Sequence, residues 1–330
     1  MNRIDTSRRD LLKAGGLGVL GCVTPSLALA QEWPAKQLRI VVPYAAGGTA
    51  DAYARSIGLH FQKMLKQAVV VDNKPGGNGL IGLNELARSA PDGYTLALCP
   101  TSVYWGNRAF YKRMPFDPDK DVQPFSFLPV GPAIFATYLN ARFRNVLEFI
   151  AYAKEHPTSV GTYAQGSYAH IMIDQLNRSH GTKIEPVHYK GEAPMWVDAA
   201  AGTIDAAFGN YASFAALYDA KRLRPLGVTT LARSPKFPDL PTFWESGLRD
   251  EIFGKESFTS MVAPASTPAQ ILKKLSELTV EWADTPEGTR FRQQYGIGTK
   301  PTLYAETVTR AKAEAPLWIE MTRNLGIPPQ

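Results

Sequence analysis

The chain has 330 residues, of which 45% are hydrophobic and 20% are charged, a globular composition that excludes a wholly disordered chain. Its formal net charge of +6 comes without a long Lys/Arg run, so the clustered basic stripe of a nucleic-acid-binding protein is missing. Two cysteines, Cys22 and Cys99, are too few for a disulfide framework or a thiolate metal cluster.

Residues 1–30 are predicted to be an export signal of the twin-arginine type. Arg8-Arg9 precedes an apolar stretch, Ala14–Val23, and Ala28–Ala30 is a small-x-small cleavage site. The apolar stretch is shorter than the roughly 18 residues of a membrane-spanning helix. An uncleaved anchor and a lipoprotein cleavage at Cys22 are the alternatives. The sequence favours cleavage after Ala30 and a periplasmic mature protein.

Short β-rich runs alternate with helical patterns along the mature chain. Strands are predicted at 38–42, 68–71, 94–99, 134–139, 159–162, 184–188, 204–208, 224–230 and 261–263, and helices at 50–65, 79–89, 146–155, 168–179, 193–201 and after 268. Strands separated by helices of this length favour parallel α/β units. Cys99 ends an apolar strand, which indicates a buried and unreactive thiol.

Two stretches rich in Pro and Asp, Met114–Pro124 and Arg233–Pro241, predict surface crossings. We therefore expect two α/β lobes, one made of residues 31–128 and 240–330, the other of residues 129–239. Two crossings between the lobes make a hinge and leave a cleft, where ligands tend to bind.

Two strand-to-helix turns are candidate anion sites. Pro43–Asp51 follows the first strand, and its Gly47-Gly48 pair lets backbone N–H groups face outward at a helix N-terminus. Gly161–His170 is the corresponding turn of the second lobe, where Ser167 can cap a helix and His170 is expected to be structural. Asn210, after a later strand, is either a ligand hydrogen-bonder or a helix cap.

A further glycine-rich stretch, Asn73–Gly82, raises the alternative of an exported NAD-dependent oxidoreductase. It contains G-x-G-x-x-G at Gly77, Gly79 and Gly82. The motif begins too far beyond its strand, and the acid expected at the end of the next strand is missing. G-x-S-x-G, Walker A, H-E-x-x-H and C-x-x-C motifs do not occur, and the five histidines lack metal-ligand spacing. We expect no enzyme activity, no metal and no cofactor.

Several ordered motifs give the mature chain a specific resemblance. It resembles the Bug/TctC-type solute receptors of tripartite tricarboxylate transport systems from about Trp33 to the C-terminus, through Pro43–Asp51 (P-F-x-x-G-G-x-x-D), Asp72–Gly79 (E-N-R-P-G-A-G-G), Pro91–Leu96, Tyr189–Gly191, Pro238–Thr242 and Val262–Pro264.

The resemblance implies an α/β, two-lobed periplasmic binding protein of type II topology with two crossings between lobes. Such a receptor, usually a monomer, closes on a small carboxylate without changing it and passes it to a small and a large integral membrane subunit. Closure is expected about residues 124–132 and 231–242. A receptor that reports the carboxylate to a membrane signalling protein is the alternative.

The resemblance also implies that backbone amides of two loops, Tyr44–Asp51 and Ala164–Ser167, hold the ligand carboxylate. The ligand contacts expected in this chain are Tyr44, Ala45, Ala46, Gly47, Gly48, Thr49, Asp51, Ser102, Ala164, Gln165, Gly166, Ser167, Asn210 and Tyr211.

Some positions depart from the family pattern. Tyr163–Gly166 has lost the first glycine of the usual S-x-G-x-G, Gly209-Asn210 replaces a usual acid, and Phe258–Ser260 replaces W-Y-G. Aromatic residues near the loops are numerous: Tyr44, Tyr104, Trp105, Tyr168 and Tyr211. These features predict an aromatic or otherwise bulky monocarboxylate rather than citrate.

Overall fold

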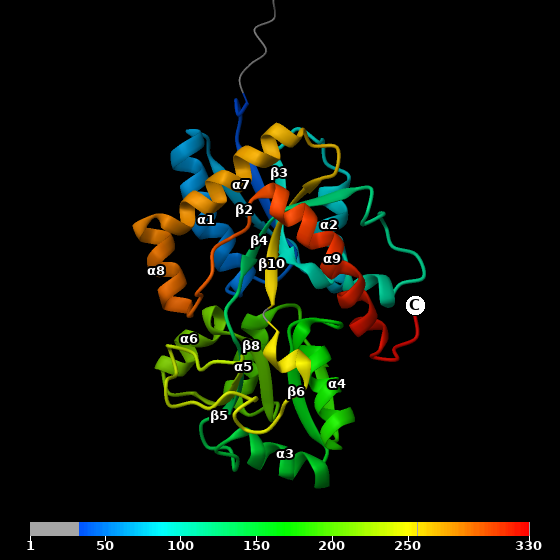
Figure 1. Cartoon of the computed structure of the whole chain (residues 1–330), viewed down its shortest axis with the longest axis vertical. Coiled ribbons are helices and arrows are strands. Elements are labelled where there is room, and N and C mark those ends of the chain that lie inside the picture. The colour runs from blue at the N-terminus through cyan, green and yellow to red at the C-terminus, as the bar shows by residue number, and fades with distance from the viewer. Residues whose placement is uncertain (1–32, 256, 330) are drawn as a thin grey trace, which may run out of the picture. The chain divides into compact units, whose positions relative to one another are not determined.

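The structure is a computed structural model that describes residues 33–255 and 257–329. The predicted export signal and its cleavage site lie outside the described residues. From Pro34 onward the chain forms one compact unit, which contains two five-stranded sheets with helices packed around each (Figure 1). Within the described part of the chain, no helix combines the length and apolar character needed to cross a membrane.

The first sheet has the strand order β2-β1-β3-β10-β4. Its strands are β1 (Leu38–Val42), β2 (Val69–Asn73), β3 (Thr95–Pro100), β4 (Val122–Pro129) and β10 (Phe258–Pro264). The helices of this half are α1 (Thr49–Leu65), α2 (Leu80–Ala87), α7 (Ala269–Asp284), α8 (Pro286–Tyr295) and α9 (Tyr304–Arg323). β1 pairs in parallel with β2 and β3, whereas β10 runs antiparallel to β3 and β4.

The second sheet repeats this pattern with the order β7-β6-β8-β5-β9. Its strands are β5 (Ala133–Tyr138), β6 (Thr158–Thr162), β7 (Ile184–His188), β8 (Ala206–Asn210) and β9 (Leu223–Thr229). Its helices are α3 (Val146–Glu155), α4 (Tyr168–His180), α5 (Glu192–Ala201) and α6 (Tyr211–Asp219). β5 runs antiparallel to β8 and β9. The predicted two-lobed α/β fold of type II topology is therefore confirmed.

The parallel arrangement predicted for all units holds only for part of each sheet. In each sheet one strand, β10 or β5, is antiparallel to its neighbours. In both cases the chain reaches the strand from the other lobe, at the crossings β4-to-β5 and β9-to-β10. A strand that arrives from the other lobe needs no crossover helix within its own sheet, so nothing forces it to be parallel.

The end of the first proline-rich stretch is a strand, contrary to the surface crossing predicted over Met114–Pro124. β4 begins at Val122, and Pro124 lies in it at a register irregularity opposite Met261/Val262. β4 is an edge strand, where a residue without an N–H group is tolerated. Pro225 of β9 lies at a similar irregularity in the second sheet.

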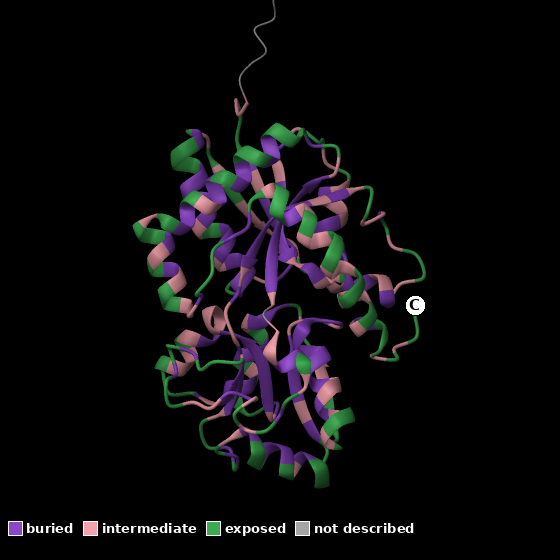
Figure 2. Cartoon of the chain, viewed as in Figure 1, coloured by how far each residue is buried: buried purple, intermediate pink, exposed green. Residues whose placement is uncertain are grey.

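The central strands of both sheets form the buried interior of the molecule (Figure 2). The core of the second lobe also takes in residues beyond the predicted boundary at 240. Phe243, Leu248 and Phe253 are buried in the same cluster as Phe135 of β5. The chain re-enters the first sheet only at β10, because these apolar side chains find their packing partners on the second sheet.

Candidate ligand-binding site

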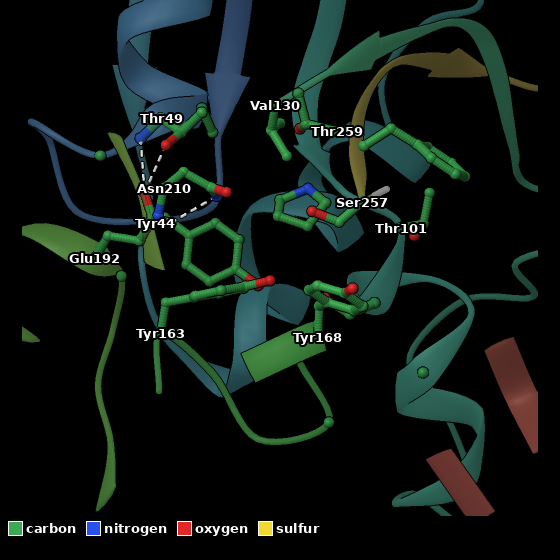
Figure 3. A pocket seen from close by; sticks show the side chains of 18 of the residues that line it. Tyr44, Thr49, Thr101, Val130, Tyr163, Tyr168, Glu192, Asn210, Ser257 and Thr259 are labelled. Carbon is green, nitrogen blue, oxygen red and sulfur yellow. Dashed lines mark hydrogen bonds between the residues drawn. The ribbon is translucent and has the colours of Figure 1, made fainter. Parts of the chain in front are cut away.

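A pocket lies where loops of the two lobes meet, with about 760 Å³ of empty space including its open mouth. The pocket is lined by Tyr44, Ala45, Gly48, Thr49, Ala50, Asp51, Pro100, Thr101, Ser102, Gly106, Val130, Tyr163, Gly166, Tyr168, Gly191, Glu192, Asn210, Ser257, Phe258, Thr259, Trp318 and Thr322 (Figure 3).

The structure brings only part of the predicted contact set to this pocket. Tyr44, Ala45, Gly48, Thr49, Asp51, Ser102, Gly166 and Asn210 line it, whereas Ala46, Gly47, Ala164, Gln165, Ser167 and Tyr211 are not among the lining residues. The prediction missed Glu192, Tyr163 and the residues that β10 and α9 contribute, such as Thr259 and Trp318. Tyr163 and Thr259 lie in stretches that depart from the family pattern and Glu192 directly follows the Tyr189–Gly191 motif, whereas no motif marked Trp318.

Gly47 and Asp51 fix the conformation of the first loop. Gly47 has a left-handed backbone (φ 86°), and its amide donates to Asp51 Oδ2 at 3.0 Å. Arg55 Nε donates to the same oxygen at 3.0 Å. Burial acts to raise the pKa of Asp51, but the hydrogen bonds from Arg55 and Gly47 outweigh it and lower that pKa below its ordinary value. Asp51 is therefore ionised and fixes the loop.

Glu192, the first residue of α5, connects this loop to the second lobe. It is 6% exposed. Its Oε2 accepts from Thr49 N at 3.2 Å, Thr49 Oγ1 at 2.6 Å and Ser213 Oγ at 2.8 Å. Its Oε1 accepts from Asn210 N at 3.0 Å and Asn210 Nδ2 at 2.8 Å. The Thr49 amide, predicted to hold a ligand carboxylate, is bonded here to a carboxylate of the protein.

The second-lobe loop is held by His170. Its Nδ1 accepts from Gly166 N at 3.0 Å, and its own amide donates to Ser167 Oγ, the N-cap of α4. The predicted cap at Ser167 is thus confirmed. Burial, with a smaller effect of the neighbouring His188, lowers the pKa of His170 to about 3, so the ring is neutral and can accept.

Loops of the two lobes touch directly at several points. Ala45 N donates to Lys190 O at 3.0 Å, and Asn78 Nδ2 donates to Gln165 O at 2.9 Å. A Cβ at Gly166 would stand 2.1 Å from Cε2 of Phe110, so only glycine fits this approach. The structure is therefore one in which the lobes are bridged.

The G-x-G-x-x-G stretch takes part in this bridging rather than in the pocket lining. It places Asn78, at φ 54°, against the second-lobe loop. A Cβ at Gly79 would clash with Val103, and one at Gly82 would crowd Pro43. These two glycines are therefore explained by close packing against the residues that follow β1 and β3.

Five aromatic side chains line the pocket: Tyr44, Tyr163, Tyr168, Phe258 and Trp318. The other aromatics singled out in the sequence lie elsewhere. Tyr104 shares a hydrogen bond with Ser260 Oγ at 2.9 Å, and Trp105 packs edge-on against Phe127. Tyr211 packs against Phe237, with ring centroids 5.5 Å apart.

The pocket lining contains two acids, Asp51 and Glu192, and no Lys, Arg or His. Across residues 33–255 and 257–329, no three His, Cys, Asp or Glu side chains gather so as to hold a metal ion. Cys99 is buried, and this burial raises the pKa of its thiol far above the ordinary value. The site offers hydroxyls, amides, aromatic rings and two carboxylates.

Comparison with known proteins agrees with this geometry. Residues 53–306 match the family model of the tripartite tricarboxylate transporter family receptor, TctC. Protein BugT of Bordetella pertussis is 30% identical over 75% of this chain and 76% of its own length. A UPF0065 protein of Agrobacterium vitis is 33% identical over 77% of this chain and 74% of its own.

Solved structures show the same likeness. An R. palustris protein with adipate is 30% identical with a TM-score of 0.84, covering 91% of this chain and all (100%) of its own. The periplasmic binding protein BugD is 26% identical with a TM-score of 0.81, covering 90% and 100%. The chain belongs to the TctC family of tripartite tricarboxylate transporter receptors, and it is a solute-binding receptor rather than an enzyme.

Proposed function

We propose that this protein captures a small carboxylate in the periplasm and delivers it to a tripartite tricarboxylate-type membrane transporter. The observation that carries the proposal is a pocket lined by loops of both lobes, with Thr49 from the first lobe and Gly166 from the second. A relative with the same fold and 30% identity has been solved with adipate, a small carboxylate.

The aromatic lining supports the finer proposal of a bulky or aromatic acid. Tyr44, Tyr163 and Tyr168 face the pocket together in Figure 3. Aromatic rings bury a large apolar area and prefer offset or edge contacts with other rings. They suit a ligand with an apolar body better than citrate, which is polar throughout.

Binding is tested by thermal unfolding of residues 31–330 against a panel of acids. The panel contains citrate, dicarboxylates, amino acids, and benzoate- and nicotinate-like acids, with NAD as the enzyme control. A ligand at about 100 times its Kd adds about 2.7 kcal/mol, which shifts the Tm of a protein of this size by several degrees. A higher Tm with one class of acid supports the receptor function, and an unchanged Tm with every acid contradicts it.

Delivery is tested separately in cells. A deletion strain is compared with the parent for uptake of the radiolabelled ligand that the unfolding panel identifies. We expect uptake to be lost and to return with the gene. Normal uptake with a lost transcriptional response would instead indicate the signalling receptor. Size-exclusion chromatography with light scattering checks the expected monomer.

A further inference from the structure

The pocket holds a carboxylate of the protein itself where a ligand carboxylate was expected. The donors to Glu192 include Thr49 N at the start of α1 and Asn210 N at the start of α6, and Glu192 itself begins α5. Gly48, the N-cap of α1, has no side chain that could cap the helix, and the side chain of Asn210 makes no capping hydrogen bond to α6. Free amides and helix dipoles of both lobes therefore converge on this one carboxylate.

No cation compensates Glu192 among the residues that the structure describes. Its five hydrogen bonds come from neutral groups of Thr49, Asn210 and Ser213. Asp51, by contrast, is paired with Arg55 at 3.0 Å. A second carboxylate brought beside Glu192 would find these amides occupied and would meet a like charge in a buried site, where repulsion is strong.

The side chain of Asn210 indicates which group a ligand needs beside Glu192. Its Nδ2 donates to Glu192 Oε1, which orients the amide and leaves Oδ1 as an acceptor. This Oδ1 belongs to a side chain that lines the pocket, is buried, and has no hydrogen-bond partner within the described residues (Figure 3). A buried acceptor without a donor is costly, so a ligand that donates a hydrogen here gains affinity.

The opposite end of the pocket carries neutral hydroxyl donors. Thr101 follows β3 and Thr259 belongs to β10, and both lie across the pocket from Glu192 in Figure 3. The hydroxyl of Thr259 is buried and has no hydrogen-bond partner within the described residues. These hydroxyls can donate to a carboxylate and bring no competing negative charge. The pocket thus has a Glu192 end and a hydroxyl end.

We propose that Glu192 is the specificity-determining residue of this site, because it occupies the anion position between α1 and α6. The pocket then takes a molecule with a single carboxylate, bound at the hydroxyl end, and a neutral or cationic hydrogen-donating group at the Glu192 end. Molecules with a carboxylate at both ends are excluded. The inference rests on the proposed function, since it takes this pocket as the place of ligand binding.

The test uses ligands and variants that differ at one group. Adipate and 6-aminohexanoate have chains of the same length and differ only in ending with a carboxylate or an ammonium group. Each is titrated calorimetrically into the wild-type protein, Glu192→Ala and Glu192→Gln. Glu192→Ala frees the amides of Thr49 and Asn210, and Glu192→Gln removes the charge with little change of size. Glu148→Gln, in the exposed first turn of α3, is the matched control.

We expect the wild-type protein and Glu148→Gln to bind adipate at least about tenfold more weakly than 6-aminohexanoate. In Glu192→Ala or Glu192→Gln, whose folding is checked by circular dichroism, adipate binding should appear or strengthen about tenfold. Failure of both variants to gain adipate overturns the inference, whether or not the wild-type protein binds either molecule. Equal binding of the two molecules by the wild-type protein overturns it as well. The proposed function fails on a different result, namely that no acid of the unfolding panel raises the Tm of the wild-type protein.

Discussion

Tyr168 and Tyr211 show how one residue type serves ligand contact in one place and packing in another. Both were predicted to lie near the ligand. Tyr168 lines the pocket, and its hydroxyl donates toward the carbonyls of Ile252 and Lys255. Tyr211 is not among the lining residues and packs against Phe237 instead. The two tyrosines therefore form a matched pair for mutation.

Tyr168→Ala should weaken ligand binding by about five- to thirtyfold, because it removes an aromatic wall worth about 1–2 kcal/mol. Tyr168→Phe, which keeps the ring, should bind normally and lose only stability. Tyr211→Ala should lose stability and keep its affinity. Calorimetric titration with the ligand found in the unfolding panel measures this, and unchanged affinity in Tyr168→Ala would contradict a ligand contact there.

His170 makes stability depend on pH. Its pKa is about 3 in the folded protein and about 6.5 in an unfolded chain. Protonation therefore favours unfolding: the contribution of His170 is complete above pH 6.5 and is lost as the pH falls toward 3. We expect urea unfolding at pH 5 to show about 2 kcal/mol less stability than at pH 7 from this residue.

The matched variants for this effect are His170→Gln and His156→Gln. His156 is exposed, so its substitution should leave the pH dependence unchanged. His170→Gln should reduce the loss between pH 7 and pH 5. Burial also lowers the pKa of His188, which shares a hydrogen bond with Thr162, so a smaller loss should remain. An equal pH dependence in both variants would show that His170 does not carry the effect.

At the scale of elements, α4 lies between two glycines with similar backbones and different surroundings. Gly166, before the helix, has φ 68°, and Gly181, at its C-cap, has φ 65°. A Cβ at Gly166 would meet the Phe110 ring, whereas one at Gly181 meets nothing within 4 Å. Alanine at either site has the same backbone cost, about 1–2 kcal/mol.

Gly166→Ala should therefore weaken ligand binding by about tenfold or more, because the loop has to move away from Phe110 and the lobes can no longer meet closely. Gly181→Ala should lose stability alone. Urea unfolding and calorimetric titration separate the two effects. Equal affinities in the two variants would mean that the contact between Gly166 and Phe110 does not matter for binding.

For the whole molecule, the question is whether the lobes close on the ligand. We expect small-angle scattering to show a smaller radius of gyration with saturating ligand, since the pocket is built from both lobes. Asn78→Ala removes the hydrogen bond to Gln165 O and should enlarge the unliganded protein and weaken binding. Asn145→Ala, which removes only the cap of α3, is the control. No compaction with ligand would contradict closure.

The sequence by itself determined what depends on neighbours along the chain. The positions of most helices and strands, the turn at Gly47 and the cap at Ser167 follow from hydrophobic period, glycine and capping chemistry within a few residues. The export signal also remains a prediction from sequence. Ordered motifs then placed the chain in a family, and with it the two-lobed topology.

Only the tertiary structure decided what joins distant segments. Glu192 reaches Thr49 across 143 positions of sequence, and nothing beside it in the sequence indicates a buried carboxylate. Phe243 and Phe253 pack on the second sheet although the preceding prolines suggested that the chain had already left it. Burial and hydrogen-bond partners depend on distances in space, which local patterns do not contain, and for that reason the charge and shape of the pocket appeared only in the folded molecule.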